Sequence, residues 1–433
     1  MDNTSPTPLQ VVLQPPSGWA GDDGLTPIDR ILDAVRSHLG MEIAFASRIH
    51  DGLREFTHIR ADCPVPVAPG VAEPLEQTLC QAVLDGRLPA LIHDASQHEA
   101  ALPLPITKAL PVGSHLNVPI TLSDGQIYGT FCCVSRIPDL SLTERDMATL
   151  RAFAQLASQQ IEGDLHQQRS RSSTTARIAA VIATDTLTIL HQPIHELRSG
   201  RPVGVECLAR FADAAERGPD RWFAEAAQVG LGQELELLAV RAALKTLPHV
   251  PSDCYVAVNV SPETVIGGAL RELVSCASRD RLVIEVTEHD AVGDYSALGA
   301  ELDWLRGYAR IAVDDVGSGY AGLRHIVELK PDILKLDMSL TRQIDTDPAR
   351  RALAHALVCF AREIGCKLVA EGIETEAERA ALARLEVPLA QGYLFSRPMP
   401  VVAAQQLLLG EREPAPLARL TDPQTGQRHQ RRA

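Results

Sequence analysis

The chain has 433 residues, of which 45% are hydrophobic and 22% are charged, and this ordinary balance excludes a fibrous chain and a wholly disordered one. At about 150 residues per domain the length allows three domains, but an α/β barrel takes about 250 residues alone, so two domains with tails fit equally well. The formal net charge of −14 argues against a general electrostatic grip on DNA or RNA.

Targeting signals are not visible in the chain. Its first residues show neither the basic segment nor the apolar run of a signal peptide, and no apolar stretch approaches the about 18 residues that cross a membrane. Nine cysteines without a Cys-x-x-Cys pair indicate reduced thiols. We therefore expect a cytoplasmic protein without membrane insertion.

Residues 1–24 and 412–433 are rich in Pro, Gly and polar residues, and we expect flexible tails there. Residues 25–162 have a mixed α+β pattern that is typical of a small sensory domain. Helical apolar spacing over residues 28–39 is followed by two pairs of alternating segments. Each pair is joined by an Asp-Gly turn, at Asp51-Gly52 and at Asp124-Gly125, and each therefore predicts a β-hairpin.

A second helix is predicted over residues 141–161, where Ser141 and Glu144 form a capping box. Its apolar residues follow a heptad-like register, and these are Met147, Leu150, Ala154, Ala157 and Ile161. The register suits the seam of a homodimer, but it also suits a helix that packs on its own sheet. We expect a homodimer held by this helix and by contacts near the loop after Asp315. Residues 163–177 are polar and predict a linker, either a loop or a solvated continuation of the helix.

Residues 178–411 predict a (β/α)₈ barrel, because short apolar strands alternate with helices of about 10–15 residues. Eight strands are expected at residues 187–191, 203–209, 254–260, 282–286, 311–313, 333–336, 367–370 and 387–390. The first two are joined by a turn at residues 197–200. Because a parallel crossover needs about a dozen residues, these two strands should be antiparallel.

Polar residues stand where these strands end, and active sites of α/β barrels are built at that face. The residues are Glu206, Asn259, Glu285, Asp314, Asp315, Lys335, Glu371 and Gln391. Any one of them could be an ordinary strand end or ion pair, but so many in successive strands favour one site.

The expected site contains five carboxylates, which would repel one another strongly without a cation. Oxygen ligands suit Mg²⁺ or Mn²⁺. The neighbouring Asp314 and Asp315 could bridge two metal ions about 4 Å apart. Both reach the site only if the chain turns there, and we assign that turn to Gly317-Ser318-Gly319. Lys335 would neutralise a phosphate oxygen or position the attacking water.

The motifs resemble the EAL-domain cyclic di-GMP phosphodiesterases over residues 175–410. The matching segments include Glu206-Cys207-Leu208-Ala209-Arg210, Asn259-Val260-Ser261, Asp314-Asp315-Val316-Gly317-Ser318-Gly319-Tyr320, Lys335-Leu336-Asp337, Glu371-Gly372-Ile373-Glu374 and Gln391-Gly392-Tyr393-Leu394-Phe395. The resemblance implies metal-dependent hydrolysis of cyclic di-GMP to linear pGpG in second-messenger signalling. A receptor that binds cyclic di-GMP without cleaving it is the alternative, and the full set of polar residues favours the enzyme.

The resemblance also implies a role for each matching position. Glu206, Asn259, Glu285 and Asp314 would hold one metal ion, and Asp315 would help to hold the second. Lys335 and Glu371 would position or deprotonate the attacking water. Gln192, Leu208 and Arg210 would contact the dinucleotide, with Gln391 beside the water and metal. Three further residues would take part in coupling dimerisation to the site through the loop that begins at Asp314: Ser318 lies in this loop, Glu288 would tether it, and Glu374 would lie close to the same site. Cys207, Val316 and Ser396 depart from the usual family residues.

The first domain resembles a GAF domain, through residues 79–86, 111–120 and 124–133. This resemblance implies a sensory unit that binds an unknown small ligand or serves as a dimerisation platform. Cys80, His93 and His115 are candidate ligand or haem contacts, and core or surface positions are the alternative that we favour. The whole chain is thus predicted as an α/β protein, with a C-terminal modified TIM-type barrel containing one antiparallel strand and an N-terminal α+β GAF-like domain.

Overall fold

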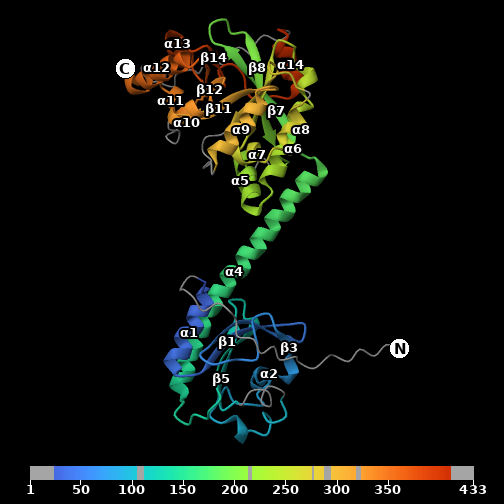
Figure 1. Ribbon diagram of the computed structural model, residues 1–433, viewed down its shortest axis with the longest axis vertical. Coiled ribbons are helices and arrows are strands. Elements are labelled where there is room, and N and C mark those ends of the chain that lie inside the picture. Colours follow the sequence, from blue (N-terminus) through green and yellow to red (C-terminus); the bar gives the residue numbers. More distant parts are fainter. Residues whose placement is uncertain are drawn as a thin grey trace, which may run out of the picture. The chain divides into compact units, whose positions relative to one another are not determined.

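Two compact units follow one another along the chain, and their boundary lies between Ser170 and Arg171, inside one helix. The computed structural model describes residues 24–104, 112–212, 217–275, 277–286, 294–317 and 323–410 (Figure 1). The two segments predicted as tails lie almost entirely outside these residues. None of the described helices is both long enough and apolar enough to span a bilayer.

The first unit is a six-stranded sheet with helices, and its strand order is β3-β2-β1-β6-β5-β4. Its elements are α1 (Pro27–Leu39), β1 (Ile43–His50), β2 (Leu53–Ala61), β3 (Ala72–Pro74), η1 (Leu75–Gln77), α2 (Leu79–Leu84), β4 (Leu91–Ile92), η2 (Ala95–Gln97), β5 (Ser114–Thr121), β6 (Ile127–Ser135) and α4 (Glu144–Thr184). Both predicted hairpins are present, as the antiparallel pairs β1–β2 and β5–β6. Gly52 and Gly125 adopt the left-handed backbone that these turns require.

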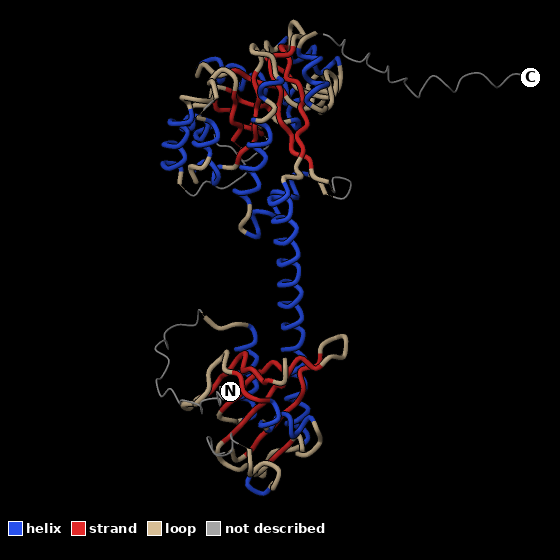
Figure 2. The backbone as a smooth tube through the Cα atoms, turned by 90° about the vertical axis from the view of Figure 1, so that its right-hand side faces the viewer, coloured by secondary structure: helices blue, strands red, loops and turns tan. Residues whose placement is uncertain are grey.

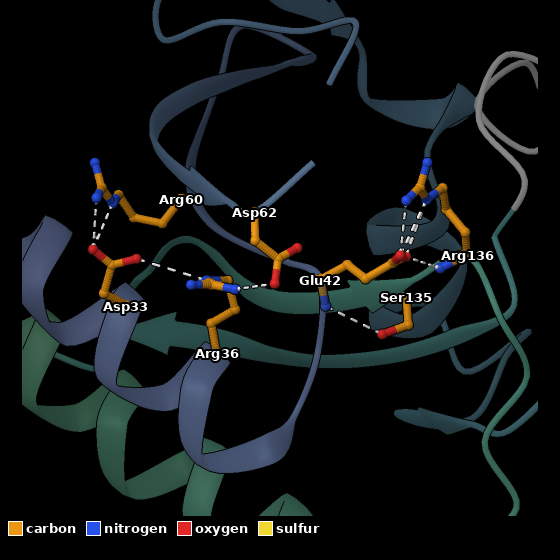
Figure 3. Close-up of polar contacts among 7 residues, drawn as sticks. All are labelled: Asp33, Arg36, Glu42, Arg60, Asp62, Ser135 and Arg136. Atoms are coloured by element: carbon orange, nitrogen blue, oxygen red, sulfur yellow. Dashed lines mark hydrogen bonds and ion pairs between the residues drawn. The ribbon is translucent and has the colours of Figure 1, made fainter. Parts of the chain in front are cut away.

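Helix α1 begins at a capping box, in which Thr26 and Asp29 satisfy each other's backbone N–H groups. Three ion pairs of 2.7–2.8 Å tie these elements together (Figure 3). Arg60 of β2 pairs with Asp33 of α1, and Arg36 of α1 pairs with Asp62 just after β2. Arg136 just after β6 pairs with Glu42 just before β1. Such partly exposed pairs are worth about 0–1 kcal/mol each. The apolar face of α1, with Leu32 fully buried, therefore does more to hold the helix on the sheet.

The heptad-like residues of α4 belong to the core of the first unit. Met147, Leu150, Ala154, Ala157 and Ile161 are all buried, at 4% exposure or less, in one cluster with residues of α1 and of the sheet. The prediction of a dimer seam at these positions is therefore wrong, and the alternative of packing within the unit holds. Helix α4 also continues without a break through residues 163–177. The homodimer itself stays a prediction.

Replacing Leu150 with Ala should test this assignment. We expect the first unit to lose about 2–5 kcal/mol of stability, because a buried leucine leaves a cavity. Hydrogen exchange of peptides from residues 24–165 would show the loss, and light scattering should show an unchanged oligomeric state. Leu156→Ala is the matched control, because Leu156 is 52% exposed on the same helix. A changed oligomeric state with unchanged hydrogen exchange would show that these residues form a dimer seam after all.

The second unit is a closed barrel with the strand order β10-β11-β12-β13-β14-β7-β8-β9. The strands, red in Figure 2, are β7 (Thr188–Glu196), β8 (Pro202–Arg210), β9 (Tyr255–Val260), β10 (Leu282–Val286), β11 (Arg310–Val316), β12 (Ile333–Leu336), β13 (Lys367–Ala370) and β14 (Leu389–Ala390). Strand β7 is antiparallel to both neighbours, β8 and β14, and all other pairs are parallel. This confirms the predicted modified barrel with one antiparallel strand.

Helices surround the barrel and supply the outer layer of its core. They are α5 (Pro219–Val229), α6 (Gly232–Leu244), η3 (Leu247–His249), α7 (Pro262–Ile266), α8 (Leu270–Val274), α9 (Tyr295–Leu305), α10 (Leu323–Leu329), α11 (Met338–Thr341), α12 (Pro348–Glu363), α13 (Glu376–Arg384) and α14 (Val401–Leu408). Two large clusters of buried aliphatic residues fill the space between these helices and the strands.

A separate cluster fills the barrel interior, with two residues from β9 and one from each of β7, β10, β11, β12, β13 and β14. These are Ile194, Tyr255, Ala257, Val283, Ala312, Ile333, Val369 and Leu389. Gly204 of β8 makes room for one of them, because a Cβ at Gly204 would lie 2.8 Å from the ring of Tyr255. Side chains alternate along a strand, so the residues two positions further toward the carboxyl ends of the parallel strands must also point inward.

Candidate metal centre at the carboxyl ends of the barrel strands

The alternation of the strands delivers the predicted polar residues to one place. All of them except Asp315 stand two residues beyond an interior position, as Glu285 follows Val283 in β10 and Lys335 follows Ile333 in β12. The same step leads to Asn259, Asp314, Glu371 and Gln391. Gln192 precedes Ile194 by two residues instead, because β7 runs in the opposite direction. The site is therefore the layer of inward-pointing side chains at the carboxyl ends of the parallel strands.

Lys335 lies at the centre of this layer, with only 1% of its side chain exposed. Its Nζ is 2.8 Å from Glu285 Oε2, 3.0 Å from Asp314 Oδ2 and 2.8 Å from Glu371 Oε1. Glu206 Oε1 lies 3.6 Å away. Burial opposes the charge of the ammonium, but the four carboxylates hold the pKa of Lys335 well above its usual value. Lys335 is therefore a permanent cation here.

One ammonium does not balance four carboxylates. Burial, and the like charges of Glu206 and Asp314, raise the pKa of Glu285 well above its usual value although Lys335 opposes this. Burial likewise raises the pKa of Glu371 to about 8. The layer therefore holds bound protons unless a further cation enters it. A divalent ion would supply the missing positive charge, and the oxygen-rich donor set suits Mg²⁺ or Mn²⁺ rather than a softer metal.

Glu206 is held in place by two amide hydrogen-bond donors. Asn259 Nδ2 donates to its Oε1 at 2.8 Å, and Gln391 Nε2 donates to its Oε2 at 2.5 Å. Although burial favours the neutral form, the charge of Lys335 and these hydrogen bonds lower the pKa of Glu206 below its usual value. Among the described residues, Gln391 Oε1 has no hydrogen-bond partner although it is buried. Such an orphaned oxygen is suited to accept from a bound water.

Two groups of carboxylates could each hold a metal ion, and they share Asp314. Glu206, Glu285 and Asp314 form one group, and Asp314, Asp315 and Glu371 form the other, with the ligand atoms of each within 4.8 Å of one another. A shared carboxylate is the usual bridge in a two-metal site. Glu371, which the sequence analysis assigned to the attacking water, is thus also placed to ligate the second ion.

Asp314 and Asp315 reach the same site through a break in the strand. The pairing of β11 with β12 shifts register between Val313 and Val316, and Asp315 has a left-handed backbone with φ of 57°. This bulge turns two consecutive side chains toward one centre. The turn therefore lies at Asp315 itself. The turn was predicted at Gly317-Ser318-Gly319, of which only Gly317 is among the described residues.

Two variants of Asp315 should separate its backbone role from its carboxylate. Asn tolerates left-handed backbone, so Asp315→Asn should keep the stability of the barrel and weaken Mn²⁺ binding about tenfold or more. Val does not, so Asp315→Val should also lose about 1–3 kcal/mol of stability. Titration calorimetry and urea unfolding measure the two effects. Unchanged Mn²⁺ affinity in the Asn variant would remove Asp315 from the metal centre.

The neighbourhood of Glu371 contains two residues that the sequence analysis missed. Thr341, buried in α11, donates its hydroxyl to the carbonyl oxygen of Glu371. Glu378 accepts from the backbone N–H groups of Gln343, Glu374 and Thr375, and so fixes the loop that follows Glu371. The spacing of Thr375 and Glu378 is a capping box, and this signal could have identified Glu378.

Of the six remaining predicted residues, four are among the described residues and two are not. Gln192 is buried, accepts from Gln391 at 3.1 Å and donates to the carbonyl oxygen of Ser396. Leu208 is half-buried on β8, and Arg210 donates to the carbonyl oxygen of Ala209. Glu374 is exposed and pairs with Arg342 at 2.7 Å. Glu288 and Ser318 lie outside the described residues.

Two of the three residues that depart from the usual family residues lie in the core. Cys207 is buried in the aliphatic cluster outside the barrel strands, where burial raises the pKa of its thiol. Val316 is 3% exposed and packs with Leu336 and Leu340. Neither residue contributes a ligand atom to the metal groups described above.

Comparison with known proteins assigns both units. Residues 175–398 match the model of the EAL domain, and residues 23–161 match that of the GAF domain. The probable cyclic di-GMP phosphodiesterase PdeD of Escherichia coli strain K12 is 29% identical over 258 residues, which are 56% of this chain and 47% of that protein. The cyclic di-GMP phosphodiesterase NbdA of Pseudomonas aeruginosa is 30% identical over 237 residues, 52% of this chain and 30% of that protein.

The chain spans less than half the length of these two curated relatives. Among solved structures, the EAL enzyme Bd1971, bound to cAMP and cyclic di-GMP, covers 85% of this chain with 93% of its own. Its TM-score is 0.53 and its sequence identity is 17%, so this likeness concerns the fold alone.

Proposed function

The chain belongs to the EAL domain family, and we propose that it is a metal-dependent phosphodiesterase that hydrolyses cyclic di-GMP to linear pGpG. The observation that carries the proposal is the pair of acidic groups that share Asp314 around the buried Lys335. The printed names of PdeD and NbdA, both cyclic di-GMP phosphodiesterases, agree with it. Cyclic di-GMP in this role makes the protein part of second-messenger signalling.

Mg²⁺ or Mn²⁺ would be held by Glu206, Asn259, Glu285 and Asp314 in one position, and by Asp314, Asp315 and Glu371 in the other. Two bound ions would supply Lewis-acid activation of the phosphodiester and of a water molecule. Gln391, with its free buried oxygen, would accept a hydrogen bond from that water. Gln192, Leu208 and Arg210 would contact the dinucleotide.

The two residues next to the attacking water would have different roles. Lys335 keeps its proton, because four carboxylates surround it, so it would donate hydrogen bonds to a phosphate oxygen or to the water. Glu371 would be the base. Its carboxylate lies 2.8 Å from Lys335 Nζ, and a positioned carboxylate can take a proton from a water molecule. The proton of the water would therefore go to Glu371.

The GAF domain would regulate this activity by binding a small ligand. The chain would act as a homodimer in the cytoplasm, with a contact near the loop after Asp315. This contact is proposed on the family resemblance, since the helical seam proved to be core.

Incubation of the purified chain with cyclic di-GMP tests the activity directly. Nucleotides separated after incubation with Mg²⁺ or Mn²⁺ should include pGpG, and a chelator should abolish its formation. Excess Ca²⁺ should inhibit, because its longer bonds and higher coordination number fit a compact two-metal site poorly. Tight binding of cyclic di-GMP without any product would instead identify a receptor.

A further inference from the structure

A second group of metal-binding side chains lies inside the first unit. Cys80 of α2, His115 of β5 and Cys132 of β6 each bring one ligand atom within 4.8 Å of the other two. All three are at most 1% exposed. Nothing in the proposed activity of the barrel uses this group, and no spacing in the sequence links its members.

The sheet and helix α2 together create this group. Asn117 of β5 stands opposite Cys132 in the pairing of β5 with β6, so His115, two residues earlier, shares the face of Cys132. Cys133 points to the opposite face, into the core cluster that contains the buried side of α4. Cys80 packs against the face of Cys132, in a cluster with Phe45 and Val134.

The distance between the two sulfur atoms suits a metal ion. Cys80 Sγ and Cys132 Sγ are 3.6 Å apart. Two thiolates bound to one tetrahedral Zn²⁺ at about 2.3 Å each stand about 3.8 Å apart. The imidazole of His115 completes a Cys₂His set, which suits Zn²⁺ and does not suit Mg²⁺ or Ca²⁺.

A buried arginine contacts the sulfur atom of Cys80. Arg54, 3% exposed, donates from Nη1 to Cys80 Sγ at 2.9 Å. Arg54 is itself paired with Glu73. Two thiolates with a divalent ion would therefore be neutral beside a neutral Arg54–Glu73 pair, which makes the burial of all these charges feasible.

Unsatisfied polar atoms mark the same face of the sheet. Within the described part of the chain, His115 Nδ1 and both polar side-chain atoms of Asn117 are buried without a hydrogen-bond partner. Native proteins leave few such atoms, and a cluster of them indicates a bound ion or water. Because Asn117 is paired with Cys132, its side chain lies on the face of the sheet that carries the Cys132 side chain.

A small cavity adjoins the group. Its volume is about 40 Å³, and His115 and Arg54 line it together with apolar residues that include Phe45, Phe56 and Val134. A single water needs about 10–15 Å³ by the same kind of measure. A fourth metal ligand, either a water or another very small molecule, therefore has room beside His115.

We propose that Cys80, His115 and Cys132 bind one Zn²⁺ ion, whose fourth position is open to the cavity. Binding would release the thiol protons of Cys80 and Cys132 to solvent and leave both sulfur atoms as thiolates. A site with three protein ligands and one open position can exchange that fourth ligand. The site would thus give the GAF unit a place to bind a small molecule by coordination.

Co²⁺ is a suitable probe, because tetrahedral thiolate ligation gives it strong visible and near-ultraviolet absorption. The full chain, reduced and freed of metal under anaerobic conditions, should take up one Co²⁺ with these bands, and Zn²⁺ should bleach them. The barrel carboxylates would not interfere, because Co²⁺ on oxygen ligands lacks thiolate bands. The chain carrying Glu206→Gln should accordingly show the same bands as the wild type.

The variant Cys80→Ala/Cys132→Ala should lose these bands completely. Cys133→Ala is the matched control, because Cys133 is equally buried on the same strand but faces the other side, and it should retain them. Absence of the bands from the wild-type chain would overturn the proposal, even if the double variant failed to fold. Bands that survive in a folded double variant would also overturn it, as would a Cys80–Cys132 disulfide found in place of metal uptake.

Discussion

Glu206→Gln should lower the hydrolysis of cyclic di-GMP by about a thousandfold while the barrel stays folded. A factor of this size corresponds to about 4 kcal/mol of transition-state stabilisation. Asn259 and Gln391 donate hydrogen bonds to Glu206 and hold its carboxylate where a cation would bind. Gln has the same shape but no charge, so metal affinity should fall together with the rate.

The metal-free chain should lose only modest stability in this variant. The mutual repulsion of the four carboxylates around Lys335 falls, but the amide of Asn259 or of Gln391 then meets an NH2 group in place of an acceptor oxygen. Product formation at saturating Mn²⁺, Mn²⁺ affinity and urea unfolding measure the three quantities. Glu301→Gln is the control, since Glu301 pairs with Arg271 at the surface of the same unit. Wild-type hydrolysis by Glu206→Gln would contradict the assignment of the site.

Lys335→Met should affect both stability and activity. Without metal, four carboxylates would remain around an apolar side chain, and breaking a buried ion pair costs about 3–5 kcal/mol. Mn²⁺ should recover much of this stability, because it supplies the charge that Lys335 removed. Hydrolysis should nevertheless fall by about 10²–10⁴-fold, since the donor beside the attacking water is lost. Unfolding can be followed through Trp222 and Trp304, which both lie in the second unit.

The same reasoning predicts how the stability of the metal-free wild-type barrel depends on pH. The pKa of Glu371 is raised from its usual 4.5 to about 8, so the folded chain binds more protons than the unfolded chain between these values. Stability should therefore fall as the pH rises from about 4.5 to about 8, and Mn²⁺ should flatten this dependence.

Lys367→Met, at an exposed position that begins β13, is the control for the Lys335→Met substitution. An equal response of Lys335→Met and Lys367→Met would show that the central ammonium is not needed.

Much of the barrel and of its site could be predicted from local pattern. Alternation within strands and the polar residue at each strand end identify the inward positions, because parallel strands of a barrel present their carboxyl ends at one face. The short turn between the first two strands determines that β7 is antiparallel, since no crossover helix fits there. Resemblance to the EAL family adds the metal and the substrate to this geometry.

Other features depended on which elements meet in space. The apolar register of α4 is the same for a dimer seam and for a core face, and only the position of α1 and the sheet shows that Leu150 is core. The left-handed Asp315 arises from a register shift between two strands, which neither strand reveals alone.

The grouping of Cys80, His115 and Cys132 is the clearest such case. The residues come from a helix and two strands, separated by 35 and 17 positions in the chain. Periodicity within one element determines which face a side chain takes, and the sequence by itself therefore placed the barrel carboxylates. Which faces then pack together depends on long-range contacts between elements, and only the tertiary structure decided that a buried Cys₂His group forms in the first unit.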